Sequence, residues 1–279
     1  MRDNYDVLRT EGRNPRTTNI DRMSTLEMVT VMNNENRAVE DAIDEVLPEI
    51  ATAVDAIASA FENGGHLIYV GAGTSGRLGI IDAAECPPTF GVDYDLVRGI
   101  IAGGNSAVFR ATENAEDDEE WGARAIRENG IVKGDVVCGL SAAGRAPFVL
   151  GAMKEAHRIG AVTVGITCNK ETLLHKVCDI TIAPYVGPEV ISGSTRLKAG
   201  TAQKLVLNML STGAMVRTGK VYGNLMINVK PTNEKLVERA TRILMEISSC
   251  DRPTAEALIA KHGEIPAALK ELGIDVRHN

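Results

Sequence analysis

Hydroxyl and glycine residues with the spacing of an anion-binding loop follow the apolar run HLIYV (66–70). The segment GAGTSGR (71–77) places Thr74 and Ser75 beside backbone N–H groups where a helix is predicted to begin. Backbone N–H groups at a helix start, joined by hydroxyl groups, suit a phosphate monoester. A plain helix cap, with glycines that serve only the turn, is the alternative. The candidate phosphate ligands of this segment are Gly73, Thr74, Ser75, Gly76 and Arg77.

The same segment matches GxGxxG, a spacing also found in dinucleotide-binding proteins. Those proteins carry an acidic residue at the end of the second strand, where it holds the ribose hydroxyls. The second predicted strand here ends in IAGG (101–104) without an acid, which disfavours a dinucleotide. A P-loop nucleotide site is excluded because no Gly-Lys-Ser/Thr follows.

Two further loops carry similar residues. The loop LSAAGRAP (140–147) follows another apolar run and precedes a predicted helix. Because loops at neighbouring strand ends bring their donors together, one bound anion or sugar phosphate explains both loops better than two separate caps. For the loop VISGSTRLK (190–198), a capped helix and a ligand site or subunit contact are equally good explanations. The candidate ligands of these two loops are Ser141, Ala142, Ala143, Gly144, Arg145, Ser192, Ser194 and Lys198.

Acidic residues occur near the first loop and in a later run. Glu85 stands directly before Cys86-Pro87-Pro88, which is predicted to stop the helix that follows the first loop. Because a carboxylate is unfavourable at the negative end of a helix dipole, the position of Glu85 indicates a function. The run that begins at Glu116 has a simpler explanation, since a solvated acidic face near a helix start gives the same pattern.

Short Val- and Ile-rich runs alternate with helical segments between residues 66 and 183. Strands are predicted at 66–70, 96–102, 135–140, 161–167 and 180–183, and helices near 75–84, 107–128, 147–159 and 170–177. This alternation predicts a parallel sheet with helices on both faces, which is an α/β fold. Ligands of such sheets bind at the carboxyl ends of the strands.

Helices are also predicted on either side of the sheet. Ser24 and Glu27 have the spacing of a capping box, which should start a helix after a polar arm at 1–22. Apolar residues at helical spacing predict one long helix over 37–62. Another long helix is expected at about 196–218, with two or three more after residue 231. The expected parts are the arm and first helix (1–36), the sugar-phosphate-binding domain (37–230) and a small C-terminal helical region (231–279).

Composition and charge exclude several classes of protein. The net charge of -7 argues against a nucleic-acid partner. The five histidines lack HxH and HExxH spacing, so no metal site is expected. Five scattered cysteines without CxxC predict reduced thiols in the cytoplasm. A polar N-terminus and the lack of a long apolar run predict neither a signal peptide nor a membrane span.

The longest motifs resemble one known family. AGTSGRLG (72–79) followed by DAAECPPTFG (82–91) is similar to the signature of N-acetylmuramic acid 6-phosphate etherases, which belong to the sugar isomerase (SIS) superfamily. The resemblance continues in IAGG (101–104), NAEDDEE (114–120), SAAGRAPFV (141–149) and GSTRLKAGTAQKLVLNMLSTGAMV (193–216). Regulatory proteins of glucokinase share parts of these motifs but are much longer. The tail after residue 246 is shorter than in many family members.

The resemblance implies a three-layer αβα SIS-type domain with a five-stranded parallel sheet, flanked by N- and C-terminal helices. It also implies a homodimer with sites near the subunit interface, no metal and no cofactor. The implied reaction cleaves the D-lactyl ether of N-acetylmuramic acid 6-phosphate to give N-acetylglucosamine 6-phosphate and D-lactate. The two catalytic glutamates of the family fall on Glu85 and Glu116. Glu116 is assigned as the base at C2, and Glu85 as the acid that helps lactate leave.

Two other functions stay open on the residues alone. A sugar-phosphate isomerase of the same superfamily would also remove a proton next to a carbonyl, but would keep the C3 substituent. A sensor would bind the phosphosugar without turnover. The ECPP and AEDD elements favour the etherase over the isomerase.

Overall fold

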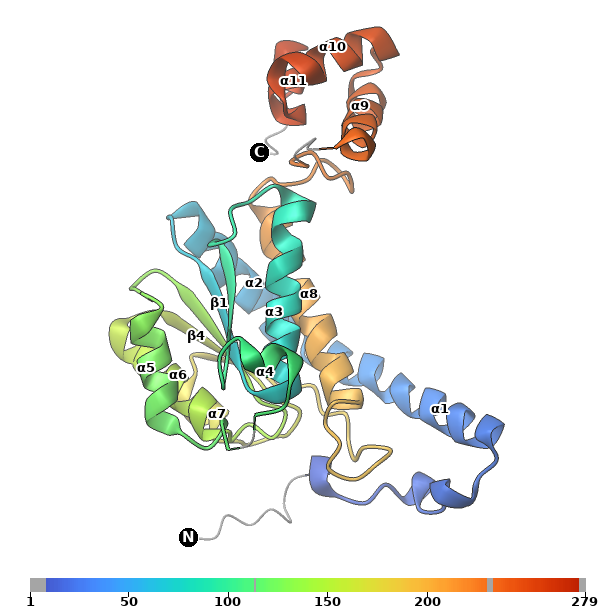
Figure 1. The fold of residues 1–279 in the computed structure, drawn as a ribbon, viewed down its shortest axis with the longest axis vertical. Coiled ribbons are helices and arrows are strands. Elements are labelled where there is room, and N and C mark those ends of the chain that lie inside the picture. Colours follow the sequence, from blue (N-terminus) through green and yellow to red (C-terminus); the bar gives the residue numbers. More distant parts are fainter. Residues whose placement is uncertain (1–8, 113, 230–232, 276–279) are drawn as a thin grey trace.

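A parallel sheet forms the centre of the chain in the computed structural model, which describes residues 9–112, 114–229 and 233–275 (Figure 1). Its strands are β1 (Leu67–Gly71), β2 (Val97–Ile101), β3 (Val136–Leu140), β4 (Val162–Ile166) and β5 (Ile180–Ile182). The strand order is β2-β1-β3-β4-β5 and every pairing is parallel. The predicted α/β class and the five predicted strands are confirmed.

The strand order reverses between β1 and β3, which is where parallel sheets bind their ligands. Gly71 ends β1 and pairs with Leu140, which ends β3. The loops that follow these strands therefore begin side by side at the carboxyl edge of the sheet. This register brings together two loops that lie far apart in the sequence.

Helices cover both faces of the sheet (Figure 1). Alternate residues of β1 enter different apolar cores, because strand side chains point to opposite faces. Leu67 and Tyr69 belong to one core, and Ile68 and Val70 to the other. The first face carries α2 (Leu47–Glu62), α3 (Gly73–Phe90) and α8 (Lys198–Arg217), and the second carries α5 (Glu119–Glu128), α6 (Pro147–Ile159) and α7 (Leu174–Val177).

The helix predicted to begin after Ser24 is confirmed as α1 (Thr25–Asp44), with both hydrogen bonds of the capping box present. The single long helix predicted over 37–62 is wrong, because α1 ends at Asp44 and α2 begins at Leu47. Pro48 explains the break, since proline lacks the N–H of a helix interior but is tolerated in a first turn.

The helix predicted over 107–128 also divides into two. α4 (Ser106–Phe109) is a single turn, and α5 begins only at Glu119. Asp118 caps α5, because its side chain accepts a hydrogen bond from the Trp121 N–H. Glu116 therefore lies on the loop between α4 and α5 rather than on a helix face.

α3 is longer than predicted. It continues through Pro87 and Pro88 and ends at Gly91, which has a left-handed conformation and donates its N–H to the Pro87 carbonyl. The stop predicted at Cys-Pro-Pro is wrong, because each proline removes only one N–H of the last turns, and Gly91 caps the helix instead. Glu85 lies inside α3, so the helix dipole gives no reason to assign it a function.

The C-terminal helices form a core of their own, apart from the sheet (Figure 1). They are α9 (Glu234–Ser248), α10 (Arg252–His262) and α11 (Ile265–Glu271), and Ile227 and Val229 pack with them. The predicted boundary at 230 falls at 230–232, outside the described residues, and the boundary at 36 falls inside α1. The three-part division stays a prediction. None of the helices in the described ranges combines the length and apolar character that crossing a bilayer requires.

Candidate active site

A pocket of about 460 Å³ opens at the carboxyl edge of the sheet, where the loops after β1 and β3 meet. Both loops line it, together with the loop before α8 and the loop between α4 and α5. A smaller cavity of about 220 Å³ adjoins it and shares Ala72, Gly73 and Glu116 with it. The structure thus brings the three predicted loops to one site.

In the first loop, Gly73, Thr74 and Ser75 line the pocket at the N-terminus of α3. The Ser75 hydroxyl donates to the Gln203 Oε1 on α8 at 2.9 Å, so its proton is engaged while its oxygen stays an acceptor. Gly76 is buried and does not line the pocket. A Cβ there would lie 2.6 Å from the Ile101 side chain, so this glycine serves the close approach of α3 to the sheet.

Arg77 lines the smaller cavity rather than the main pocket. Its Nε donates to the Val108 carbonyl at 2.9 Å, which ties α3 to α4. Because the two cavities meet at Glu116, the Arg77 guanidinium stands on the side of the site that also carries this carboxylate.

In the second loop, Ser141, Ala142, Ala143 and Arg145 line the pocket. The Ala142 carbonyl is held by three donors, namely the backbone N–H of Cys168, the hydroxyl of Thr167 and the amide of Asn169. These bonds fix the loop in front of α6.

Gly144 has a supporting role in the second loop. It has φ +67, and a Cβ there would lie 2.3 Å from the Thr172 Oγ1, so it makes room for the turn rather than lining the pocket.

The third loop contributes residues other than those predicted. Gly193 and Thr195 line the pocket, whereas Ser192 and Ser194 do not. Ser192 donates instead to the Gly12 carbonyl at 3.4 Å. Ser194 is absent from the pocket lining as well.

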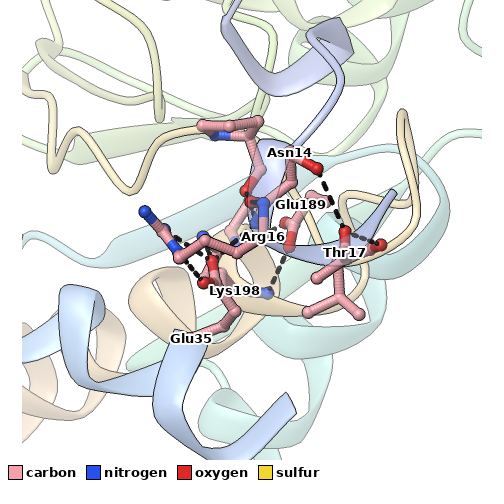
Figure 2. A network of polar contacts seen from close by, with 9 residues as sticks. Asn14, Arg16, Thr17, Glu35, Glu189 and Lys198 are labelled. Atoms are coloured by element: carbon pink, nitrogen blue, oxygen red, sulfur yellow. Dashed lines mark hydrogen bonds and ion pairs between the residues drawn. The ribbon is translucent and has the colours of Figure 1, made fainter. Parts of the chain in front are cut away.

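Lys198 does not line the pocket, and its side chain lies in a buried cluster (Figure 2). Its Nζ lies 3.0 Å from the Glu35 Oε2, and both side chains are almost fully buried. The backbone N–H groups of Lys198 and Ala199 donate to the carboxylate of Glu189 at 3.0 and 2.9 Å. Glu189 accepts the first N–H groups of α8, and Glu35 pairs with the Lys198 ammonium. Neither these N–H groups nor the ammonium is therefore available to a ligand in the pocket.

Glu35 is the centre of this cluster. Its carboxylate also accepts hydrogen bonds from the Arg16 guanidinium and, at 2.7 Å, from the Asn14 amide. The Arg16 hydrogen bond, with those of Lys198 and Asn14, outweighs burial and lowers the pKa of Glu35 from 4.5 to about 2. The cluster joins the N-terminal arm to α1 and α8. Residues 9–22 form this arm.

Glu116 lies in the pocket, as the resemblance implied. Its side chain is exposed to the cavity, and its backbone carbonyl accepts the N–H of Phe148 at 2.9 Å. This bond fixes the loop before α5 to the first turn of α6. A carboxylate is thereby held next to the two candidate phosphate loops.

Glu85 lies elsewhere in the single chain. It is exposed on α3, about 18 Å along the helix axis from Gly73 at 1.5 Å per residue. In Figure 1, α3 begins near α4 and ends near the segment that precedes α9. Glu85 therefore lies outside the pocket that contains Glu116 in the same chain.

Comparison with known proteins gives consistent results. A family model described as the glucokinase regulatory protein N-terminal SIS domain matches residues 49–157. The N-acetylmuramic acid 6-phosphate etherase of Clostridium botulinum strain Hall is 56% identical over 272 residues, which cover 98% of this chain and 87% of that protein. The protein of the same name from Pasteurella multocida is 56% identical over 94% of this chain and 88% of its own length.

The chain belongs to the N-acetylmuramic acid 6-phosphate etherase family.

Solved structures agree with this etherase family in fold. A phosphoheptose isomerase from Neisseria gonorrhoeae has a TM-score of 0.54 and 19% identity, and the match covers 68% of this chain and 98% of that one. One from Francisella tularensis has a TM-score of 0.52, also at 19% identity, and the match covers 70% of this chain and 100% of that one. Together with the parallel sheet, these matches confirm the predicted three-layer SIS-type fold.

Several pocket residues of this etherase-family chain were not predicted from the sequence. Asp117 and Thr195 each adjoin a motif that was recognised, so their neighbours gave a signal. Glu11 lies in the arm, far from any motif, and nothing in its surroundings indicated a site. Only the folded arm brings it to the pocket.

Other reactive groups in residues 9–112, 114–229 and 233–275 do not form a second centre. Among the described residues, no three His, Cys, Asp or Glu side chains are grouped to hold a metal ion. All five cysteines are free. Burial raises the pKa of Cys86 and of Cys168 to about 12, so these thiols stay protonated and unreactive.

Proposed function

We infer that the chain cleaves the D-lactyl ether of N-acetylmuramic acid 6-phosphate, giving N-acetylglucosamine 6-phosphate and D-lactate. The observation that carries this conclusion is the 56% identity to etherases over nearly the whole chain. The enzyme is a carbon–oxygen lyase that acts in the recycling or catabolism of cell-wall amino sugars. No cofactor is needed for the reaction derived below.

The reaction is an elimination followed by addition of water. When the sugar ring opens, C1 becomes an aldehyde and the C2 proton becomes acidic. A base removes this proton, the C2–C3 double bond forms, and the C3–O bond breaks as an acid protonates the lactyl oxygen. Water then adds to C3 of the unsaturated aldehyde, with the proton-transfer roles reversed. The net change replaces the lactyloxy group at C3 by a hydroxyl group whose oxygen comes from water, and the ether oxygen leaves with D-lactate.

The pocket supplies groups for two parts of this chemistry. The N-terminus of α3 and the loop before α6 offer backbone N–H groups and the hydroxyls of Thr74 and Ser141 to the phosphate. Arg145 adds a positive charge in the same pocket. Glu116 stands beside these loops, and we assign it as the base at C2.

The lactyl oxygen needs an acid, which we assign to Glu85 of a second copy of the chain. Glu85 is exposed on α3 and lies outside the pocket of its own chain. Ile81, one turn earlier on the same helix, also exposes 59% of its surface. We therefore propose a homodimer in which each pocket combines its own Glu116 with the Glu85 of the other subunit.

Mixing two inactive variants tests the shared site. Glu85→Gln and Glu116→Gln are purified separately, combined under conditions that exchange subunits, and assayed for D-lactate. Random pairing makes half of the dimers mixed, each with one intact site, so about a quarter of the parent activity should return. No recovery between exchanged, dimeric variants would show that each chain uses its own Glu85.

Release of D-lactate from N-acetylmuramic acid 6-phosphate by the parent protein tests the function itself. Lactate appearing with N-acetylglucosamine 6-phosphate supports the etherase. Binding of the phosphosugar without lactate would instead indicate a sensor. A shift of the carbonyl from C1 to C2 with the ether intact would indicate an isomerase.

We also propose a cytoplasmic location. All five cysteines are free, which fits a reducing compartment. Recovery of the protein with the soluble cytoplasmic fraction, away from periplasmic markers, is the measurement that checks this.

A further inference from the structure

The arm is bonded directly to the third pocket loop and, through Asn169, to the second. The Thr10 carbonyl accepts the Gly193 N–H at 3.3 Å, and the Thr10 hydroxyl accepts the Asn169 amide at 3.1 Å. The same Asn169 amide donates to the Ala142 carbonyl in the second loop at 3.0 Å. Thr10 is fully buried. The residue next to it, Glu11, is therefore carried by backbone that the pocket loops hold in place.

A second anchor fixes the arm on the other side of Glu11. Asn14 and Arg16 both donate to the buried carboxylate of Glu35, which also pairs with Lys198 (Figure 2). Since breaking a buried charge pair leaves an uncompensated charge, this anchor resists detachment. Glu11 lies between two tethered points rather than on a free terminus.

The Glu11 side chain lines the pocket that also contains Glu116 and Asp117. Its Oε2 lies against Gly193, where an added Cβ would approach to 3.0 Å. Within the described ranges, the Glu11 carboxylate makes no hydrogen bond or ion pair with the protein. Its oxygens are thus held near the ligand space without a partner from these residues.

We propose that Glu11 is a substrate-binding residue that recognises the sugar part of the phosphosugar. This inference rests on the etherase function proposed above. The arm holds the Glu11 carboxylate over the bound sugar, where it accepts hydrogen bonds from hydroxyl groups or from the acetamido N–H.

The chemistry of a carboxylate decides which part of the substrate it contacts. An ionised carboxylate only accepts hydrogen bonds, and it repels other anions. The phosphate is an anion without N–H donors, whereas the sugar offers several O–H groups and one amide N–H. Glu11 therefore favours the sugar and disfavours a second anion at its position, which orients the substrate with its phosphate toward the loops.

Binding of two ligands to the full-length parent and to Glu11→Ala tests the proposal. The ligands are N-acetylglucosamine 6-phosphate and inorganic phosphate, and calorimetry measures both affinities. Because hydrogen bonds to a charged acceptor are lost, the affinity for N-acetylglucosamine 6-phosphate should fall about tenfold. Inorganic phosphate should bind equally well or more tightly, because a negative charge has been removed.

A structural role of Glu11 would give a different result. If the substitution damaged the arm, the affinities for both ligands would fall together. If the Glu11 side chain had no role in binding, neither affinity would change. Either outcome overturns the proposal. Thr18→Ala is the matched control on the arm, because Thr18 is exposed and its hydroxyl only reaches the Pro15 carbonyl at 3.5 Å. It should leave both affinities unchanged.

Gly193 offers an independent test of the position of Glu11. A methyl group at Gly193 should displace the carboxylate and weaken the sugar phosphate in the Gly193→Ala variant. If this effect acts through Glu11, it should be much smaller in the Glu11→Ala background. Alanine is also strained at this position, where φ is +75, and this part of the loss should be the same in both backgrounds. A loss that does not shrink at all in the Glu11→Ala background would contradict the assigned contact.

Kinetics separate this proposal from the proposed function. In the parent, D-lactate release establishes the etherase. In Glu11→Ala, KM for N-acetylmuramic acid 6-phosphate should rise about tenfold while kcat changes less, because the contact exists before and during the reaction. A parent without lactate release would refute the etherase, whereas the comparison of the two ligands would still decide the role of Glu11. A fall in kcat with unchanged KM would contradict a binding role.

Discussion

The buried carboxylate of Glu35 on α1 and the pocket carboxylates of Glu11 and Glu116 have different surroundings. Glu35 is buried, and Arg16, Lys198 and Asn14 all contact its carboxylate. Glu11 and Glu116 line a cavity, and within the described ranges neither carboxylate has a protein partner of this kind. The hydrogen-bonding capacity of the Glu35 carboxylate is taken up by protein groups, whereas the carboxylates of Glu11 and Glu116 face the ligand space.

The same residue type thus serves structure in one region and binding in the other. A buried charge is tolerated only when other charges and donors compensate it. Glu35 thereby fixes the arm and cannot take part in chemistry. The pocket carboxylates keep their acceptor capacity for a substrate, while the buried cluster keeps one of them, Glu11, in place.

Glu116→Gln should have the largest effect among single changes in the pocket. Removal of a general base lowers kcat by about a thousandfold, and the fold should be unaffected because Glu116 is exposed. Lactate release measures the loss. In deuterated water, exchange of the C2 hydrogen should disappear as well. Persistent exchange would contradict the assignment of Glu116 as the base, and Asp117→Asn, its neighbour in the pocket, is the matched comparison.

Glu35→Gln should have the largest effect on stability. The variant leaves the Lys198 ammonium buried without its charge partner, so the free energy of unfolding should fall by about 3 kcal/mol. Urea unfolding measures it. Glu40→Gln, an exposed change on the same helix, should alter stability by less than about 0.5 kcal/mol. Similar losses of unfolding free energy in both variants would contradict the distinction between buried and exposed carboxylates.

The difference between parent and Glu35→Gln should depend on pH. The pKa of Glu35 is about 2 in the folded chain against an ordinary 4.5, so its ionised form stabilises the fold above about pH 4.5. This contribution is lost as the pH falls from about 4.5 towards about 2. Urea unfolding at about pH 5 and about pH 3 should therefore show the stability gap between the two proteins narrowing on acidification. A constant gap would contradict the lowered pKa.

Ser24→Ala should have a small effect that leaves both regions intact. Ser24 caps α1, and its exposed side chain accepts the N–H of Glu27. Loss of the cap should lower stability by about 1 kcal/mol, visible as a small fall in Tm. Lactate release should stay unchanged. A large loss of activity would show that the start of α1 contributes to the site.

The strands and the two main loops could be predicted because their signals are local. Val- and Ile-rich runs, glycines and hydroxyl residues determine where β1 and β3 end and where α3 and α6 begin. Two of the errors in helix boundaries arose at prolines. Pro48 separates α1 from α2, while Pro87 and Pro88 continue α3. The difference depends on where a proline falls within a helix, which apolar spacing does not reveal.

Local patterns of residue types were enough to predict the parallel sheet, the two loops at neighbouring strand ends and the family to which the chain belongs. That Lys198 is buried, that Glu11 reaches the pocket and that Glu85 does not became evident only in the folded chain. The reason is physical. Secondary structure follows from contacts between residues close in sequence, whereas the direction of a charged side chain depends on partners that are distant in the chain, such as Glu35 for Lys198.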